Sequence, residues 1–191
     1  IRMRNIDFSK WELRKWAIKT ANAEAYKSAD CVGSLEEEFE TKRVEKKCRG
    51  VVTKVKIKPI GGTLNLTMHI PYDIYCDMFD MVRDDLIDGV QGYGTDNIHQ
   101  DFSCVGELYN EDNEMMLVAY PKCVSATGPN TNVENGAEEI PEVELEISLM
   151  PDENGYLRYE ALPDDITGNT AIATQWMTNF TPELVQKGTE A

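Results

Sequence analysis

Residues 54–71, KVKIKPIGGTLNLTMHIP, alternate between apolar and polar side chains along most of their length. Before Gly61 and Gly62, lysines alternate with Val55 and Ile57. After the two glycines, the apolar positions are Leu64, Leu66, Met68 and Ile70. Strict alternation on both sides of a glycine pair is typical of a β-hairpin with one apolar face. The stretch therefore predicts a hairpin that turns at Gly61–Gly62 and has a polar face to be explained.

Alternation and turn-forming residues extend this strand character over much of the chain. The other segments predicted as strands or hairpins are 14–20, 34–52, 101–126, 142–150 and 151–162. Ser9 and Glu12 also form a capping box that could begin a helix near the first of these segments, although the alternation there favours a strand. The sequence NEDN at 110–113 is the expected turn of the second hairpin, and residues 128–137 have the composition of a long loop.

One segment has helical periodicity. After Pro71, apolar residues recur at helical spacing at Ile74, Met78, Met81, Val82 and Leu86, and the glycine-rich stretch from Gly89 ends the pattern. The tail has room for a short helix. The chain is thus predicted to be mainly β (α+β), an antiparallel β-sandwich or barrel with one flanking helix, in a single domain of residues 1–191. Residues 1–13 and 166–191 are predicted to be terminal arms.

Composition limits the classes of function. The net charge of −15 argues against a protein that grips nucleic acid through its phosphates. No apolar run approaches the roughly 20 residues that span a bilayer, and the N-terminal residues lack the core of a signal peptide. The five cysteines are widely spaced, without a CxxC pair, and indicate reduced thiols made in a cytoplasm.

The sequence offers little for catalysis. With only two histidines a metal site is not expected, and no nucleotide, hydrolase or calcium motif is present. His99 and Cys104 could form a dyad, but nothing around them indicates an activated nucleophile. We therefore predict no catalytic residues, no metal, no cofactor and no enzymatic activity.

Charge is distributed unevenly along the chain. Residues 42–58 hold eight Lys or Arg against Glu45, and residues 134–165 hold eleven Asp or Glu against Arg158. The two regions could be separate solvated faces. Alternatively, the basic region of one copy could bind the acidic region of the next in a head-to-tail contact. The residues predicted for such a contact are Lys42, Arg43, Lys46, Lys47 and Arg49, in a segment, 41–50, expected to be a mobile loop or strand extension that becomes ordered on assembly.

The segment 47–81, KCRGVVTKVKIKPIGGTLNLTMHIPYDIYCDMFDM, resembles the central part of the major tail proteins, or tail tube proteins, of long-tailed phages of Gram-positive bacteria. The likeness consists of a basic stretch, a strand, the Gly-Gly pair, a second strand, Pro-Tyr-Asp and a short helix, and it covers roughly residues 30–82. It implies a structural virion protein, assembled in the host cytoplasm, whose subunits form hexameric rings that stack into a tube. Double-stranded DNA would pass through the channel without specific binding, and the expected partners are further copies and other tail proteins, such as tape measure and tail completion proteins.

A tube that conducts DNA has a reason to line its channel with carboxylates, because they repel phosphates. The candidates for lumen-facing residues lie on one side of two predicted strands and are Glu36, Glu38, Glu40, Glu144 and Glu146. A solvated outer face is the alternative for each strand. At the level of the whole protein, the alternatives are a monomeric acidic β-sandwich that binds a protein or small ligand, and an enzyme with an unrecognised carboxylate site.

Overall fold

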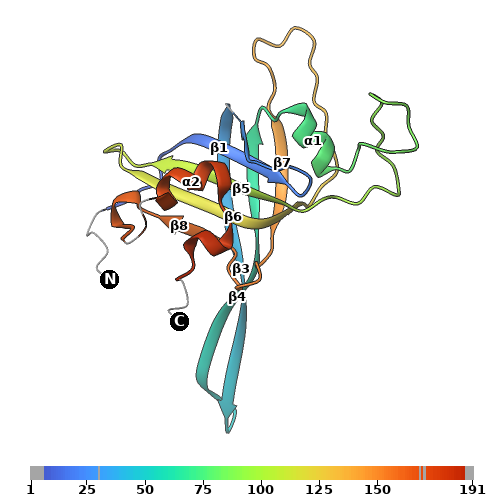
Figure 1. Cartoon of the computed structure of the whole chain (residues 1–191). Coiled ribbons are helices and arrows are strands. Elements are labelled where there is room, and N and C mark those ends of the chain that lie inside the picture. The colour runs from blue at the N-terminus through green and yellow to red at the C-terminus, as the bar shows by residue number, and fades with distance from the viewer. Residues whose placement is uncertain (1–6, 30, 168, 170, 188–191) are drawn as a thin grey trace.

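The computed structural model describes residues 7–29, 31–167, 169 and 171–187 (Figure 1). The strands are β1 (Glu12–Thr20), β2 (Lys27–Ala29), β3 (Val32–Cys48), β4 (Val51–Met68), β5 (Phe102–Tyr109), β6 (Met115–Ser125), β7 (Val143–Leu149) and β8 (Tyr159–Ala161). The helices are α1 (Tyr72–Met78), α2 (Ala171–Asn179) and the 3-10 turns η1 (Pro163–Asp165) and η2 (Pro182–Val185). All strand pairs are antiparallel, in the order β2-β1-β5-β6-β7-β4-β3, with β8 beside β6.

The sheet bends into two layers that enclose the main core. Strands β1, β5 and β6 form one layer and β3, β4 and β7 the other, and the layers are joined where Cys123–Ser125 of β6 pair with Ile147–Leu149 of β7. The alternating apolar residues of both layers meet between them, with Trp16 and Tyr120 opposite Leu64 and Ile147 in one buried cluster. Helix α1 adds Ile74, Met78 and the following Phe79 to that cluster. The predicted mainly β, antiparallel fold is confirmed.

A second helix covers the outer face of the β1-β5-β6 layer. Trp176 of α2 is buried against Val105 and Leu117, and its indole N–H donates to the carbonyl of Val118 at 2.9 Å. The chain therefore has two flanking helices where the sequence predicted one. None of the helices in the described part of the chain is long and apolar enough to cross a membrane.

The predicted terminal arms are described only in part. Residues 1–6, 168, 170 and 188–191 lie outside the described residues. The N-terminal segment joins the sheet at Trp11, whose N–H donates to the carbonyl of Tyr109. In the C-terminal segment, α2 and η2 pack on the chain's own sheet through Trp176, Phe180 and Leu184.

The predicted turn at Gly61–Gly62 is wrong. The chain turns at Arg49–Gly50, where both residues have positive φ, 50° and 81°, as a two-residue type I′ hairpin requires. Gly61 and Gly62 lie inside β4, opposite Glu40 and Phe39. A Cβ atom on Gly62 would lie 2.8 Å from the Glu38 carbonyl oxygen, so this glycine permits a close approach of strands rather than a turn.

The helix after Pro71 is shorter than predicted. It ends at Met78 because Asp80 adopts a left-handed conformation (φ 53°) and the Met81 N–H donates to the Cys76 carbonyl at 2.8 Å, which closes the last turn. The apolar residues that continue the helical spacing, Val82 and Leu86, are exposed on a loop. Elsewhere the predicted strand near 14–20, the 101–126 hairpin, the 142–150 strand and the 128–137 loop are confirmed.

Candidate functional site

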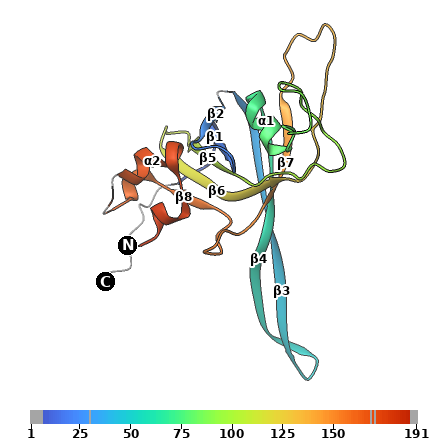
Figure 2. The same ribbon diagram turned by 45° about the vertical axis from the view of Figure 1, so that its right-hand side comes forward.

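The most prominent feature is a two-stranded arm, residues 41–60, that projects from the body (Figures 1 and 2). Strand β4 lies between β3 and β7 only from Gly62 to Met68 and has β3 as its single neighbour from Gly61 down to Val51. The arm consists of residues 41–48 of β3 and 51–60 of β4, so it extends roughly 30 Å. The predicted mobile-or-extended segment 41–50 is a strand extension that forms half of this arm.

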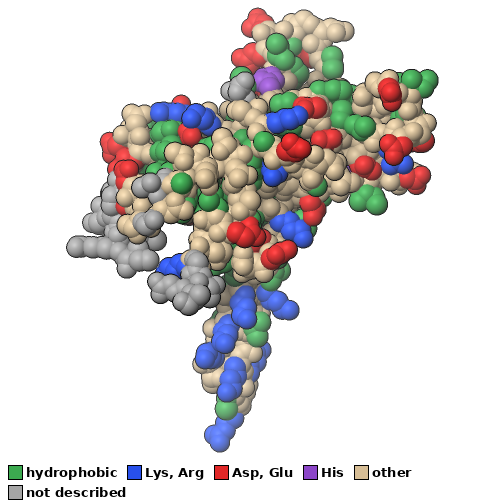
Figure 3. All heavy atoms as spheres, viewed as in Figure 1, with side chains coloured by type: hydrophobic (Ala, Val, Ile, Leu, Met, Phe, Trp, Pro, Cys, Tyr) green, Lys and Arg blue, Asp and Glu red, His purple; other side chains and the backbone are tan. Residues whose placement is uncertain are grey.

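One face of the arm carries most of its lysines. In an antiparallel pair, directly opposed residues share a face, and Lys42 opposes Lys58, Val44 opposes Lys56, and Lys46 opposes Lys54. This basic face therefore combines five lysines with one valine. Figure 3 shows Lys and Arg side chains gathered along the arm, whereas Asp and Glu side chains are spread over the body and the loops at its far end.

The other face of the arm, which we call the apolar face, carries apolar side chains along β4 and charged side chains along β3. Val55 and Ile57 lie on it at 39% and 62% exposure, with Val52 nearby at 40%. On β3 the same face carries Glu45 between Arg43 and Lys47, with Arg43 Nε 2.6 Å and Lys47 Nζ 4.0 Å from its carboxylate. The five predicted contact residues are thus divided: Lys42 and Lys46 belong to the basic face, Arg43 and Lys47 to the apolar face, and Arg49 to the turn. All five are exposed.

The predicted lumen residues lie together on one exposed face of the β3-β4-β7 layer. Asn65 of β4 opposes Glu36 on one side and Glu146 on the other, and Thr67 and Thr63 continue the same face beside Glu144 and Glu38. Glu36, Glu38, Glu40, Glu144 and Glu146 are all exposed. We call this set the acidic sheet face. No pattern in the sequence indicates that the two strands share a face, because only their register with β4 brings them together.

The carboxylates of the acidic sheet face are too far apart for a metal site, but they create a negative electrostatic potential over the face. Residues two apart on one strand are about 7 Å apart, and glutamates on β3 and β7, separated by β4, are about 10 Å apart. Metal ions need oxygen ligands at about 2.0–2.6 Å. Glutamates two apart on one strand still act jointly, because their spacing of about 7 Å lies within the screening length of about 8 Å at physiological salt, whereas the charges of the two strands are screened from each other more strongly. In the part of the chain that the structure describes, no group of three or more His, Cys, Asp or Glu could hold a metal ion.

Glu37 points to the opposite, core side of β3. One carboxylate oxygen accepts from the Tyr120 hydroxyl at 2.6 Å, and the other forms an ion pair with Arg158. Burial, followed by the nearby Glu37 charge, raises the pKa of Tyr120 well above its ordinary value, so the hydroxyl stays protonated and donates. Glu37 interrupts the apolar pattern of its strand because Arg158 and Tyr120 compensate its charge, which local periodicity could not indicate.

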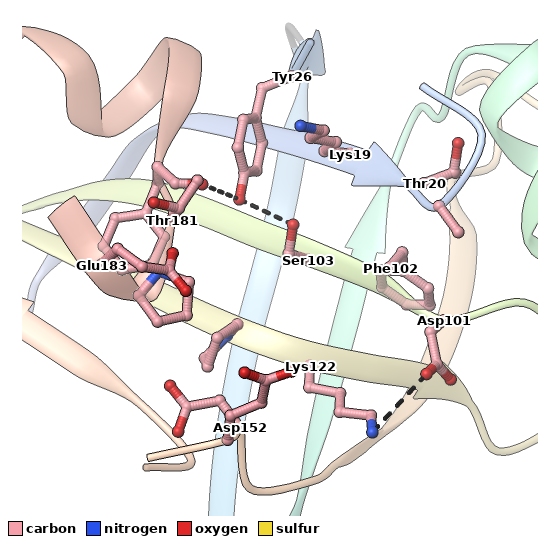
Figure 4. Close-up of a pocket in the computed structure, with 15 residues that line it drawn as sticks. Lys19, Thr20, Tyr26, Asp101, Phe102, Ser103, Lys122, Asp152, Thr181 and Glu183 are labelled. Atoms are coloured by element: carbon pink, nitrogen blue, oxygen red, sulfur yellow. Dashed lines mark hydrogen bonds and ion pairs between the residues drawn. The ribbon is translucent and has the colours of Figure 1, made fainter. Parts of the chain in front are cut away.

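A hollow lies between the sheet and the C-terminal segment (Figure 4). Its volume is about 470 Å³. Tyr26 points into it, with its hydroxyl 2.7 Å from the Ser103 hydroxyl and donating to the Phe180 carbonyl at 3.3 Å. Asp101 and Lys122 form a 4.0 Å ion pair at its rim. Burial raises the pKa of Tyr26 well above its ordinary value, so the phenol is neutral and cannot act as a base at neutral pH.

His99 and Cys104 do not form a catalytic dyad. Cys104 is fully buried, and burial raises the pKa of its thiol, which keeps it protonated. His99 instead lies 2.9 Å from the Tyr93 hydroxyl through Nε2 and 2.8 Å from the Ser125 carbonyl through Nδ1. These two residues therefore support packing and loop structure.

No family model matches the chain, and no curated protein sequence matches it. Its fold is similar to that of a chain in the cryo-EM structure of the anti-feeding prophage baseplate, 6-fold symmetrised, with a TM-score of 0.43, 11% identity, and coverage of 82% of this chain and 97% of that one. It is also similar to a chain in the cryo-EM structure of the anti-feeding prophage cap, which terminates the tube, with a TM-score of 0.40, 10% identity, and coverage of 84% and 96%. At this level the likeness concerns the course of the chain and assigns no role.

Proposed function

We propose that this protein is a structural subunit that assembles with copies of itself into stacked rings, forming a phage-like tail tube through which double-stranded DNA passes. The observation that carries the proposal is the arm. It is a two-stranded extension with an apolar face and a basic face, and no other described part of the chain covers either. The resemblance of residues 47–81 to tail tube proteins agrees with this role.

The arm has physical reasons to bind a partner. A two-stranded hairpin alone is marginally stable in water, because it has no third strand or core to pack against. Two of its cross-strand pairs, Lys42–Lys58 and Lys46–Lys54, place like charges directly opposite each other, which is unfavourable. An acidic neighbour would relieve this repulsion, and a neighbour with apolar surface would cover Val55 and Ile57. A second copy of the chain offers both an acidic surface and exposed apolar side chains outside its own arm.

The edges of the sheet also favour assembly. The described sheet ends at β2 and at the 17-residue strand β3, whose outer hydrogen-bonding edge has no strand beside it. A long open edge is an aggregation hazard unless something covers it. Pairing between subunits in a closed ring would remove such edges.

The acidic sheet face supports the DNA-conduit part of the proposal. A channel wall should let DNA slide, so it should not neutralise phosphates with fixed cations. Five exposed carboxylates on one face would repel the DNA backbone instead. We therefore assign Glu36, Glu38, Glu40, Glu144 and Glu146 to the lumen as part of the proposal.

Charge reversal in the arm tests self-assembly. Replacing Lys46, Lys47 and Arg49 with Glu should block polymerisation, measured by sedimentation velocity, and leave thermal unfolding of the subunit unchanged, because all three side chains are exposed. Lys19→Glu with Lys122→Glu is the control on the body and should assemble normally. Unchanged polymer yield in the arm variant would argue against the proposed contact, and a wild-type chain that stays monomeric would favour a binding module.

A second variant tests the lumen assignment. Replacing Glu36, Glu38 and Glu40 with Lys should still permit tubes, since these side chains would face a wide aqueous channel. Such tubes should retain added double-stranded DNA at low salt and release it as salt is raised. Tubes that retain no more DNA than wild type would remove the lumen assignment without affecting the tube itself.

A further inference from the structure

We propose that the surface that receives the arm lies at the opposite end of the molecule, on a second copy of the chain. We call it the distal surface and define it as segments 82–98 and 127–141. This inference rests on the proposed self-assembly and specifies the partner site. In Figures 1 and 2 the arm and the 127–141 loop lie at opposite ends of the molecule, and the 82–98 loop extends from the body near α1, away from the arm.

The chain itself fixes this separation. Strand β4 runs without a break from the arm turn at Val51 to Met68, just before α1 and the 82–98 loop. Its 18 residues span roughly 60 Å. An arm therefore cannot fold back onto the distal surface of its own subunit. A contact between these two different surfaces is heterologous, and repeated contacts of this kind produce rings or open stacks.

Exposed apolar side chains are concentrated at these two ends. On the arm they are Val44, Val51, Val52, Val55, Ile57 and Ile60. On the 82–98 loop they are Val82, Leu86, Ile87, Val90, Tyr93 and Ile98. Val133 and Ile140 add two on segment 127–141, and Tyr72 lies beside the 82–98 loop, where its hydroxyl donates a hydrogen bond to Gln91. Among the described residues the remaining large exposed hydrophobics are Trp11 and Tyr156, so the two ends hold nearly all of the uncovered apolar surface.

The two ends also have opposite charge. The arm carries eight Lys or Arg against Glu45, whereas the 82–98 loop carries four aspartates against Arg83, and the 127–141 segment carries three glutamates and no base. Arg83 lies 3.4 Å from Asp80 and 3.6 Å from Asp85, so its charge is compensated locally. A basic, apolar arm and an acidic, apolar surface are complementary in both respects.

The 82–98 loop has a defined shape in the free subunit. The Asn97 side-chain amide nitrogen lies 2.5–3.1 Å from the carbonyl oxygens of Phe79, Asp80 and Gly92, which share its two hydrogens, and its oxygen accepts from the Gly94 N–H. Val82 and Gln91 form a β-bridge across its base. These bonds hold the backbone while the apolar side chains remain outside, so little ordering is needed on binding.

Compensatory charge reversal tests the pairing. One variant carries Lys54→Glu, Lys56→Glu and Lys58→Glu, and a second carries Asp84→Lys, Asp88→Lys and Asp96→Lys, which leaves the Arg83 ion pairs intact. In each variant, the protein concentration at which half of the chains are assembled should rise at least about tenfold at low salt. Sedimentation velocity measures this concentration. The combined six-site variant should recover most of the assembly. The thermal unfolding temperature of the dilute subunit should not fall, because these positions are exposed and the carboxylates introduced by Lys54→Glu and Lys58→Glu would oppose Lys46 and Lys42.

The matched control is Glu36→Lys with Glu38→Lys and Glu40→Lys, which makes the same charge change on the acidic sheet face and should assemble as wild type. If the arm variant fails to assemble but the distal variant assembles normally, the receiving surface is wrong and the proposed function stands. Loss of assembly in the control alone would place the contact on the acidic sheet face. Failure of the combined variant to recover would overturn direct pairing, and a monomeric wild type would overturn both proposals.

Discussion

Removing the apolar side chains of the arm should weaken assembly without weakening the subunit. In the free chain Ile57 is 62% exposed and Val55 is 39% exposed. Full burial of such a side chain contributes about 1.5–3 kcal/mol, so covering the exposed fractions of both would contribute about 1.5–3 kcal/mol in total. Replacing both with serine removes nearly all of this, which corresponds to a rise of about 10- to 150-fold in the concentration of half-assembly.

Sedimentation velocity over a concentration series measures this shift, and urea unfolding of the dilute protein measures subunit stability. The double variant should unfold within about 0.5 kcal/mol of wild type, as expected for exposed sites. Leu64→Ala, on the same strand but fully buried, is the contrast and should lose about 2–5 kcal/mol of unfolding free energy. If half of the serine-variant chains assemble at the same protein concentration as wild type, the reasoning is refuted, because the apolar face of the arm would then not contact a neighbouring subunit.

Three further outcomes follow from the body. Glu37→Ala should lower the unfolding free energy of dilute protein by about 1.5–3 kcal/mol, whereas Glu38→Ala on the exposed face should change it by less than about 0.5 kcal/mol; equal effects would contradict the assigned ion pair. Gly62→Ala should cost about 1–3 kcal/mol more than Gly61→Ala, whose added carbon would meet its nearest backbone atom at 3.6 Å, and the reverse order in urea unfolding would be inconsistent with the close approach. Because burial raises the pKa of Tyr120 above its unfolded value of about 10, its contribution to stability is complete below that pH and declines above it, by up to about 1.4 kcal/mol per pH unit. Urea midpoints at pH 8 and pH 11 should therefore differ less in Tyr120→Phe than in wild type, and an unchanged difference would oppose this assignment.

Much of the strand content could be predicted from the sequence, because most strands bury one face and so alternate. The 101–126 hairpin and the 142–150 strand are examples, and in the latter Leu145, Ile147 and Leu149 are buried whereas Glu144 and Glu146 are exposed. The turn at Arg49–Gly50 could not be predicted in this way. Alternation continues through the arm although neither face is buried, and the glycine pair at 61–62 is a stronger turn signal than Arg-Gly.

Contacts between residues far apart in the sequence could not be predicted either. Arg158 compensates Glu37 from 121 positions away, and no local pattern links them. The glutamates of β3 and β7 were predicted as separate sets and lie on one face only because β4 separates the two strands. The end of α1 depended on a left-handed Asp80, which has no strong sequence signal, so the exposed 82–98 loop was predicted in part as helix.

The central claim is that this chain builds a hollow tube from copies of itself. Negative-stain electron microscopy of the purified wild-type protein, over a series of rising concentrations at low salt, tests it most directly. We expect rings and tubes with an axial channel, and tubes that lengthen as the concentration rises. A preparation that contains only 21.6 kDa subunits at every concentration, with no rings or tubes in the images, would contradict the claim.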